Sequence, residues 1–282
     1  MIVPVILPWV TNWPMTKTAL EDVLRQTSLE GISSPVFLVG NGVDPAEDAV
    51  CRGYLQQTNP PGVIYYSPSV QVSLATIWNR TLEVGWEMGA TCALVVNNDV
   101  RLWEGTLATL IRAQQALQTL FISGVGVTAD QFSTFCDNPV IDQSQRGGPD
   151  FSCFLITQEC HQQFPFDEHF FPAYCEDLDY HRRLMLAGKG DRISSINLPF
   201  AHLGGGSGTL KSLPLKRREQ LQAAIATARK YYQQKWGGGV NHETFLSPFG
   251  KQEPDLGEQI CHVTTPDLQA HRCTGRRGRV EG

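Results

Sequence analysis

The amino-acid sequence predicts an α/β protein built on a mainly parallel β-sheet with helices on both faces. Through the first half of the chain, short apolar runs alternate with longer segments of helical spacing, which is the pattern of successive β-α-β units. The length of 282 residues suits one large α/β domain or two small ones. A content of 41% hydrophobic and 18% charged residues is typical of a globular protein in water.

The first strand is expected near the N-terminus, at residues 2–7. Pro4 and Pro8 interrupt this apolar segment and no basic residues precede it, so we interpret it as a buried strand and not as a signal peptide. A helix is expected at 16–26, with Thr16 as its N-cap. The other elements expected in this half are strands at 36–39, 63–66 and 93–96 and helices at 45–57, 72–88 and 104–117.

The second half of the chain has a different character. Residues 128–149 are polar and rich in turn formers, and we expect them to form a loop near the functional site. A weakly patterned, extended tail is expected from residue 251. The remaining expected elements are strands at 121–127, 151–156 and 193–199, a short helix at 158–164 and a long polar helix at 215–236.

Composition and motifs exclude several classes of function. The net charge of −5 argues against broad nucleic-acid binding, and no apolar run is long enough for a transmembrane helix. Neither a Gly-x-Gly-x-x-Gly opening to a helix nor a P-loop motif is present. The eight cysteines lack any Cys-x-x-Cys pair, which favours buried thiols and a cytoplasmic location. A zinc site is disfavoured in the tail, where zinc-capable side chains cluster at Cys261, His262, His271 and Cys273.

Two acidic clusters carry the functional prediction. Asn97-Asn98-Asp99 directly follows the apolar run 92–96, and Glu176-Asp177-Leu178-Asp179 opens a helix-like stretch. Carboxylates at the carboxyl ends of parallel strands face the edge of the sheet at which α/β proteins bind ligands. One carboxylate there can hold a divalent metal, and a second can act as a base.

Each of these residues also has a structural interpretation. Asp99 could be a turn former, and acidic residues at a helix start are favoured by the helix dipole. His202 could be structural, although the glycine-rich run 204–208 after it favours a loop that closes over a ligand. The aromatic surroundings of Glu176 and Asp177 would raise a carboxylate pKa and suit it to proton transfer. Arg182 or Arg183 lies at a spacing that allows pairing with Asp179.

Taken in order, four motifs resemble those of glycosyltransferase family 2, which has the GT-A fold. The resemblance covers roughly residues 1–240, and residues 241–282 are then an extension. It implies a nucleotide-sugar-binding half at 1–127 and an acceptor-binding, catalytic half at 128–240. The motifs are Asn97-Asn98-Asp99, the segment 166–171, Glu176-Asp177-x-Asp179 with Arg183, Leu184 and Gly188, and His202.

The resemblance implies a role for each candidate residue. Asp99, with Asn97 and Asn98, would bind the diphosphate of the sugar nucleotide and, with His202, a Mn2+ or Mg2+ ion. Asp177 would be the base that deprotonates the acceptor, and Glu176 would orient the acceptor or Asp177. The residues implied in nucleotide binding are Pro8, Thr11, Asn41 and Asn79, although the second strand here ends in Gly40-Asn41-Gly42 where the family often has Asp.

The predicted function is transfer of a hexose-like sugar from a nucleotide-diphosphate sugar to an acceptor hydroxyl, with inversion. The acceptor could be a glycan, a lipid-linked sugar, a protein or a modified base. A nucleotidyltransferase is one alternative, but residues 8–15 lack the glycine-rich basic loop expected there. A non-catalytic sugar- or nucleotide-binding module is the other, and it would be expected to have lost the base.

Overall fold

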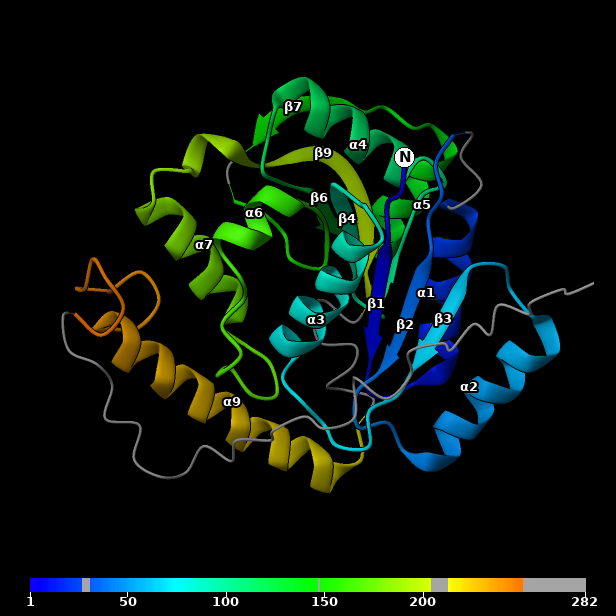
Figure 1. Ribbon diagram of the computed structural model, residues 1–282, viewed down its shortest axis with the longest axis horizontal. Helices are drawn as coiled ribbons and strands as arrows, with labels where there is room; N and C mark the ends of the chain where they lie inside the picture. The colour runs from blue at the N-terminus through cyan, green and yellow to red at the C-terminus, as the bar shows by residue number, and fades with distance from the viewer. Residues whose placement is uncertain (27–30, 147, 204–212, 251–282) are drawn as a thin grey trace, which may run out of the picture.

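A nine-stranded sheet forms the centre of the protein in this computed structural model, which describes residues 1–26, 31–146, 148–203 and 213–250 (Figure 1). The strand order is β3-β2-β1-β4-β8-β6-β9-β5, with β7 paired to β9. The strands are β1 (Val5–Trp9), β2 (Val36–Gly40), β3 (Val63–Tyr66), β4 (Cys92–Val96), β5 (Val100–Arg101), β6 (Phe121–Val127), β7 (Asp142–Arg146), β8 (Cys153–Thr157) and β9 (Ile193–His202).

Most of the long strands run in one direction, which confirms the predicted α/β class with a mainly parallel sheet. β3, β2, β1 and β4 are mutually parallel, and β6 pairs parallel with β9. β8 lies between these two groups and runs antiparallel to both β4 and β6. The start of β8 therefore lies at the same sheet edge as the carboxyl ends of β4 and β6.

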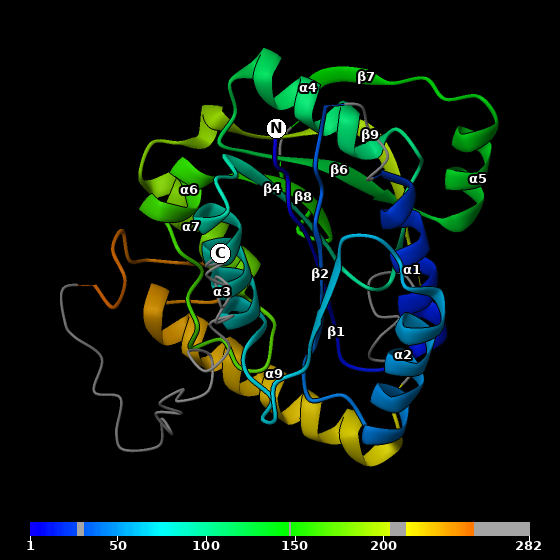
Figure 2. The same cartoon turned by 45° about the vertical axis from the view of Figure 1, so that its right-hand side comes forward.

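Helices cover both faces of the sheet (Figure 2). Along β4, Leu94 and Val96 belong to the core cluster that packs against α1 and α4, whereas Ala93 and Val95 belong to the cluster of α3, α6 and α7. Burial on both faces explains why β4 is apolar throughout. The helices are α1 (Trp13–Gln26), α2 (Pro45–Thr58), α3 (Leu74–Glu87), α4 (Thr106–Leu117), α5 (Ala129–Asp137), α6 (Gln158–Gln163), α7 (Glu176–Leu186) and α9 (Leu215–Trp236).

The first helix begins earlier than the sequence predicted. α1 starts at Trp13, so Thr16 lies within the first turn and is not the N-cap. Asn12 has the capping role instead, because its Oδ1 accepts a hydrogen bond from the Met15 N–H at 3.3 Å. Pro14 in the first turn needs no hydrogen-bond partner for its nitrogen, which is compatible with this earlier start.

Residues 128–149 are not the expected loop, because they contain α5 and β7. Thr128 and Gln131 form a capping box at the start of α5. No residue of α5 is buried, so no apolar periodicity marked the helix in the sequence.

Further sequence expectations concern the cysteines, membrane-spanning helices, the glycine-rich run and the tail. The described cysteines are free thiols, at Cys51, Cys92, Cys136, Cys153, Cys160 and Cys175. Within the described ranges, no helix combines the length and the apolar character needed to cross a membrane. The glycine-rich run 204–208 and the four zinc-capable residues of the tail lie outside the described residues.

Candidate functional site

Several chain segments bring polar residues to one edge of the sheet. The Asn41 N–H donates to the carbonyl oxygen of Trp9 at 2.8 Å, which joins the ends of β2 and β1. The Asn97 N–H donates to the Ser152 carbonyl oxygen at 2.9 Å, which joins the end of β4 to the start of β8. The expected convergence of strand ends is therefore present, and it involves the predicted site residues Asn41 and Asn97.

A cavity of about 470 Å³ lies beside the end of β4 and the start of β8, within the range of about 300–1,000 Å³ that is typical of small-molecule sites. It brings the two acidic clusters together, because Asn97 lines it along with Glu176 and Asp177. The other lining residues are Leu74, Trp78, Gly124, Val125, Gly126, Gly148, Pro149, Asp150, Phe151, Ser152 and Ser195.

Glu176 is a buried carboxylate in the wall of this cavity. It is the first residue of α7 and is only 5% exposed, and its Oε2 has no hydrogen-bond partner within the described part of the chain. Burial, with a contribution from the charge of Asp177, raises the pKa of Glu176 to about 8. An unpaired buried carboxyl oxygen is unfavourable for folding, and a bound ligand that donates a hydrogen bond would satisfy it.

Asp177 is half-buried beside it, and its Oδ1 accepts a hydrogen bond from the Leu178 N–H at 2.8 Å. Burial raises the pKa of Asp177, and His181 one turn later in α7 opposes this shift. A carboxylate with a raised pKa is a better proton acceptor near neutral pH than an ordinary one. The position and the electrostatics of Asp177 therefore suit a general base.

Asp99 and His202 lie close to each other, as the sequence predicted for a shared metal site. The Asp99 Oδ1 and the His202 Nε2 are 3.5 Å apart, and the Asp99 carboxylate raises the pKa of His202. The short pairing of β5 with β9 brings the two segments together, since Val100 pairs with His202. Ser152 Oγ lies 3.5 Å from the other ring nitrogen of His202.

Asp99 and His202 form only part of a metal-binding set. No group of three metal-ligating side chains is present in the described ranges. A carboxylate and an imidazole are both donors that Mn2+ accepts, and such ions commonly complete their coordination with substrate phosphates and water. The donor chemistry therefore fits an ion that is shared with a phosphate-containing substrate.

Asn98, Thr11 and Asn41 have structural contacts at the same edge. The Asn98 Nδ2 donates to the Thr11 carbonyl oxygen at 3.3 Å and to the Thr16 Oγ1 at 2.9 Å, which ties β4 to the start of α1. The Asn41 side chain exchanges two hydrogen bonds with the backbone of Val72, at 2.8 and 2.9 Å. These bonds fix the loops after β1, β2 and β3, and Pro8 lies buried within β1.

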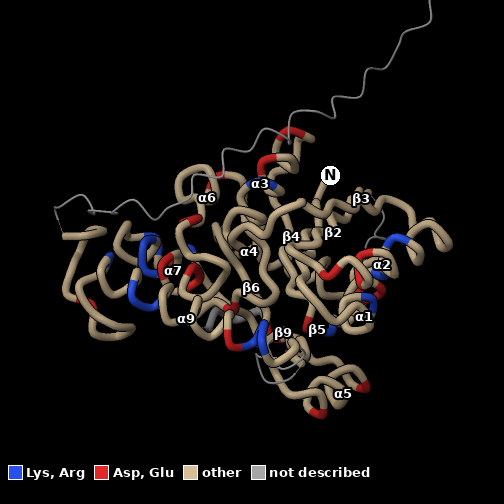
Figure 3. The backbone as a smooth tube through the Cα atoms, turned by 90° about the horizontal axis from the view of Figure 1, so that it is seen from below, with Lys and Arg blue, Asp and Glu red and all other residues tan. Residues whose placement is uncertain are grey.

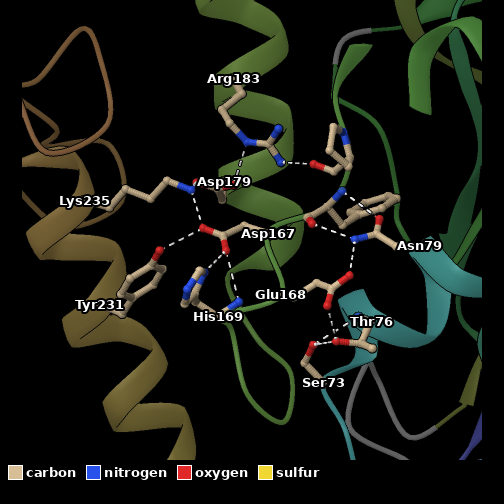
Figure 4. Close-up of polar contacts among 12 residues, drawn as sticks. Ser73, Thr76, Asn79, Asp167, Glu168, His169, Asp179, Arg183, Tyr231 and Lys235 are labelled. Atoms are coloured by element: carbon tan, nitrogen blue, oxygen red, sulfur yellow. Dashed lines mark hydrogen bonds and ion pairs between the residues drawn. The ribbon is translucent and has the colours of Figure 1, made fainter. Parts of the chain in front are cut away.

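Asn79 lies away from the cavity lining, in a buried hydrogen-bond network of α3 (Figure 4). Its Oδ1 accepts from the Phe166 N–H, and its Nδ2 donates to the Phe166 carbonyl oxygen and to the Glu168 Oε1, each at 2.9 Å. Asn79 thus anchors the loop that precedes α7. Its predicted contact with the nucleotide stays a prediction.

A second network attaches α9 to α7 and to the same loop (Figure 4). The Lys235 Nζ lies 2.5 Å from Asp167 Oδ2 and 2.7 Å from Asp179 Oδ1, and Lys235 is only 5% exposed. Arg183 Nε also pairs with Asp179 at 2.8 Å, which confirms the pairing predicted from helical spacing. Because Asp179 lies in the first turn of α7, the network fixes the helix that begins with Glu176.

Asp150 and Ser152 are cavity residues that the sequence reasoning missed. Asp150 accepts hydrogen bonds from the Ser152 N–H at 2.9 Å and from the Gly126 N–H at 3.2 Å. They lie at the site because β8 runs antiparallel, so that the start of this strand, and not its end, faces the cavity. The Gly148-Pro149-Asp150 turn before β8 was the available signal, but it could not reveal the strand direction.

No family model matches this chain, and no curated protein matches it either. Solved structures do resemble it. A mannosyltransferase of Pyrobaculum calidifontis, PcManGT, in complex with GDP-Man and Mn2+ has a TM-score of 0.56 at 12% identity. The match covers 80% of this chain and 61% of the mannosyltransferase, so this chain spans less than two thirds of its length.

Residues 1–349 of S. aureus TarS give a similar match. The TM-score is 0.52 at 12% identity, over 84% of this chain and 74% of TarS 1–349. The same fragment in complex with UDP-GlcNAc matches over 81% of this chain and 72% of the fragment, again with a TM-score of 0.52. At this identity the likeness shows that the chain has the fold of these proteins.

Proposed function

We propose that this protein is a glycosyltransferase that moves a sugar from a nucleotide-diphosphate sugar to an acceptor hydroxyl. The observation that carries the proposal is the meeting of Glu176 and Asp177 with the Asn97 segment in one cavity, beside Asp99 and His202. The structural neighbours lend support, because two of them are described in complex with GDP-Man and with UDP-GlcNAc.

In the proposed mechanism, Asp177 accepts the proton of the acceptor hydroxyl as its oxygen attacks the anomeric carbon of the donor sugar. The new carbon–oxygen bond forms on the face opposite the diphosphate, whose bond to the anomeric carbon breaks. The bonding electron pair leaves with the diphosphate, so the configuration at the anomeric carbon is inverted. Glu176 orients the acceptor or Asp177 from its buried position in the cavity wall.

Asp99 and His202 are the residues that would hold a Mn2+ or Mg2+ ion. Such an ion, when bound, would supply positive charge that stabilises the leaving diphosphate. The segment 97–99 and the loops at Thr11 and Asn41 would form the donor side of the site, within residues 1–127. The segment 128–240, which carries Asp150 and α7, would form the acceptor side.

The proposal is tested by thermal-shift and turnover assays with UDP-GlcNAc and GDP-mannose, with and without Mn2+. We expect stabilisation by one sugar nucleotide and release of the nucleoside diphosphate. Asp177→Asn should lower kcat by about 100- to 10,000-fold, as for loss of a general base, while donor binding persists. Glu87→Gln on the exposed face of α3 is the matched control.

Four outcomes would contradict the proposal or its assignment of the base. Stabilisation by neither sugar nucleotide would remove the proposed function. Binding without turnover in wild type would favour a binding module, and consumption of a nucleoside triphosphate with release of pyrophosphate would favour a nucleotidyltransferase. Wild-type turnover in Asp177→Asn would remove Asp177 as the base.

A further inference from the structure

The described residues that line the 470 Å³ cavity include acidic side chains and no cationic ones. Three carboxylates line it, from Asp150, Glu176 and Asp177, whereas no Lys, Arg or His is found among its described lining residues. The acidic positions at the start of α7 are visible in Figure 3. A diphosphate carries negative charge and is therefore poorly suited to the part of the cavity that Asp150, Glu176 and Asp177 line.

Two histidines near the cavity act on acidic residues without lining it themselves. His181 affects the pKa of Asp177 and His202 pairs with Asp99, but neither lines the cavity. Burial and the charges of Asp177 and Glu176 raise the pKa of Cys175, which precedes α7, to about 11, and the Arg229 guanidinium opposes this shift. Burial and the charge of Asp177 raise the pKa of Glu176 to about 8, so the negative charge of the lining near pH 7 comes mainly from Asp150 and Asp177.

Two buried polar atoms on residues that line the cavity are unpaired within the described chain. The Glu176 Oε2 lacks a donor, and the indole Nε1 of Trp78 lacks an acceptor. Buried polar atoms in folded proteins are normally hydrogen-bonded. These two unpaired atoms therefore suggest that a ligand forms hydrogen bonds with them. A hydroxyl group both donates and accepts hydrogen bonds, and a sugar ring carries several of them.

We infer that this cavity is the acceptor subsite and that it takes a neutral or cationic hydroxyl-bearing sugar ring and discriminates against anionic acceptors. The inference rests on the proposed function, because it identifies the cavity beside Asp177 as the place where the acceptor hydroxyl is deprotonated. Trp78 and Phe151 supply apolar walls for the face of the ring. Asp150, Glu176 and Asp177 supply hydrogen-bond acceptors for its hydroxyl or ammonium groups.

The test measures binding of three matched probes to the full-length protein by saturation-transfer NMR. The probes are methyl glucoside, its 2-amino-2-deoxy analogue and methyl glucuronide, at low ionic strength. We expect the first two to bind and the glucuronide to bind at least about tenfold more weakly, because like charges repel within a few ångströms. The difference should shrink several-fold in Asp150→Asn, and in Asp177→Asn if the first variant is unfolded, but not in Glu87→Gln.

The inference is overturned if the glucuronide binds as tightly as the glucoside, or if none of the three probes binds. Thermal stabilisation by UDP-GlcNAc and GDP-mannose is measured on the same samples to separate the two proposals. Stabilisation by a sugar nucleotide together with tight glucuronide binding would leave the proposed function standing and remove the charge selectivity. Lack of stabilisation by either nucleotide would remove the proposed function and, with it, the assignment of the cavity to an acceptor.

Discussion

Replacing Lys235 by methionine tests whether the network between α7 and α9 stabilises the position of α7, which carries the proposed base Asp177. Methionine keeps the unbranched apolar stem but removes the cation that lies within 2.5 Å of Asp167 and 2.7 Å of Asp179. Both carboxylates would remain buried or nearly so, with side-chain exposures of 12% and 0%. The variant therefore leaves the Asp167 and Asp179 carboxylates buried without the cation that pairs with them.

The expected loss of unfolding free energy in Lys235→Met depends on the hydrogen-bond partners that Asp167 and Asp179 keep. Removing one member of a buried ion pair typically costs about 3–5 kcal/mol. Asp179 would still accept from Arg183 Nε at 2.8 Å and from the Trp236 Nε1 at 3.0 Å, and Asp167 would still accept from the Tyr231 hydroxyl at 2.9 Å. We therefore expect a loss of unfolding free energy at the lower end of this range, about 3 kcal/mol. This loss corresponds to a fall in Tm of about 6–12 °C for a protein of this size.

The assay is thermal and urea unfolding of wild type, Lys235→Met and Lys230→Met. Lys230 is exposed on the same helix, so its replacement should change the unfolding free energy by less than about 0.5 kcal/mol. Adding Asp167→Asn to Lys235→Met removes one of the two buried carboxylates that have lost their cation. The double variant should therefore recover part of the lost unfolding free energy. The reasoning is refuted if Lys235→Met is no less stable than the control, or if the added Asp167→Asn lowers stability further.

The remaining predictions concern three other groups. The pKa of Glu176 is about 8 in the folded state, above its ordinary value of 4.5. The contribution of the protonated Glu176 carboxyl to stability is therefore fully present below pH 4.5 and is lost as the pH rises through about 8. Glu176→Gln should therefore be more stable than wild type at about pH 8.5 and lose the advantage at about pH 4, in urea titrations at both values. The pKa of Asp167 is held below 3.8, because the His169 hydrogen bond and the Lys235 charge outweigh the effect of burial. Wild type should thus lose stability more steeply than Asp167→Asn as the pH falls below 3.8, measured by acid unfolding. Asn79→Ala removes bonds to both backbone groups of Phe166 and should cost about 2–4 kcal/mol in the same urea assay; a loss below about 0.5 kcal/mol would contradict that anchoring role.

Local patterns in the sequence were enough to predict the class of the fold. Strand β3 lies where it was expected, at Val63–Tyr66, and the other long strands and helices differ mainly at their ends. Asp99 and His202 could be proposed as neighbours only through the resemblance to a known family, and the structure places them 3.5 Å apart. Helix α5 was missed because it buries no side chain, so that periodicity carried no information about it.

The alternation of strands and helices, the acidic clusters and the pairing of Arg183 with Asp179 could be predicted from local patterns, because they depend on residues close together in the chain. The antiparallel direction of β8, which brings Asp150 into the cavity, and the contacts of Lys235 with Asp167 and Asp179 became evident only in the folded protein. Folding also buries Glu176 without a partner for its Oε2 among the described residues. Strand direction, burial and long-range ion pairs depend on contacts between distant segments, which no local pattern encodes.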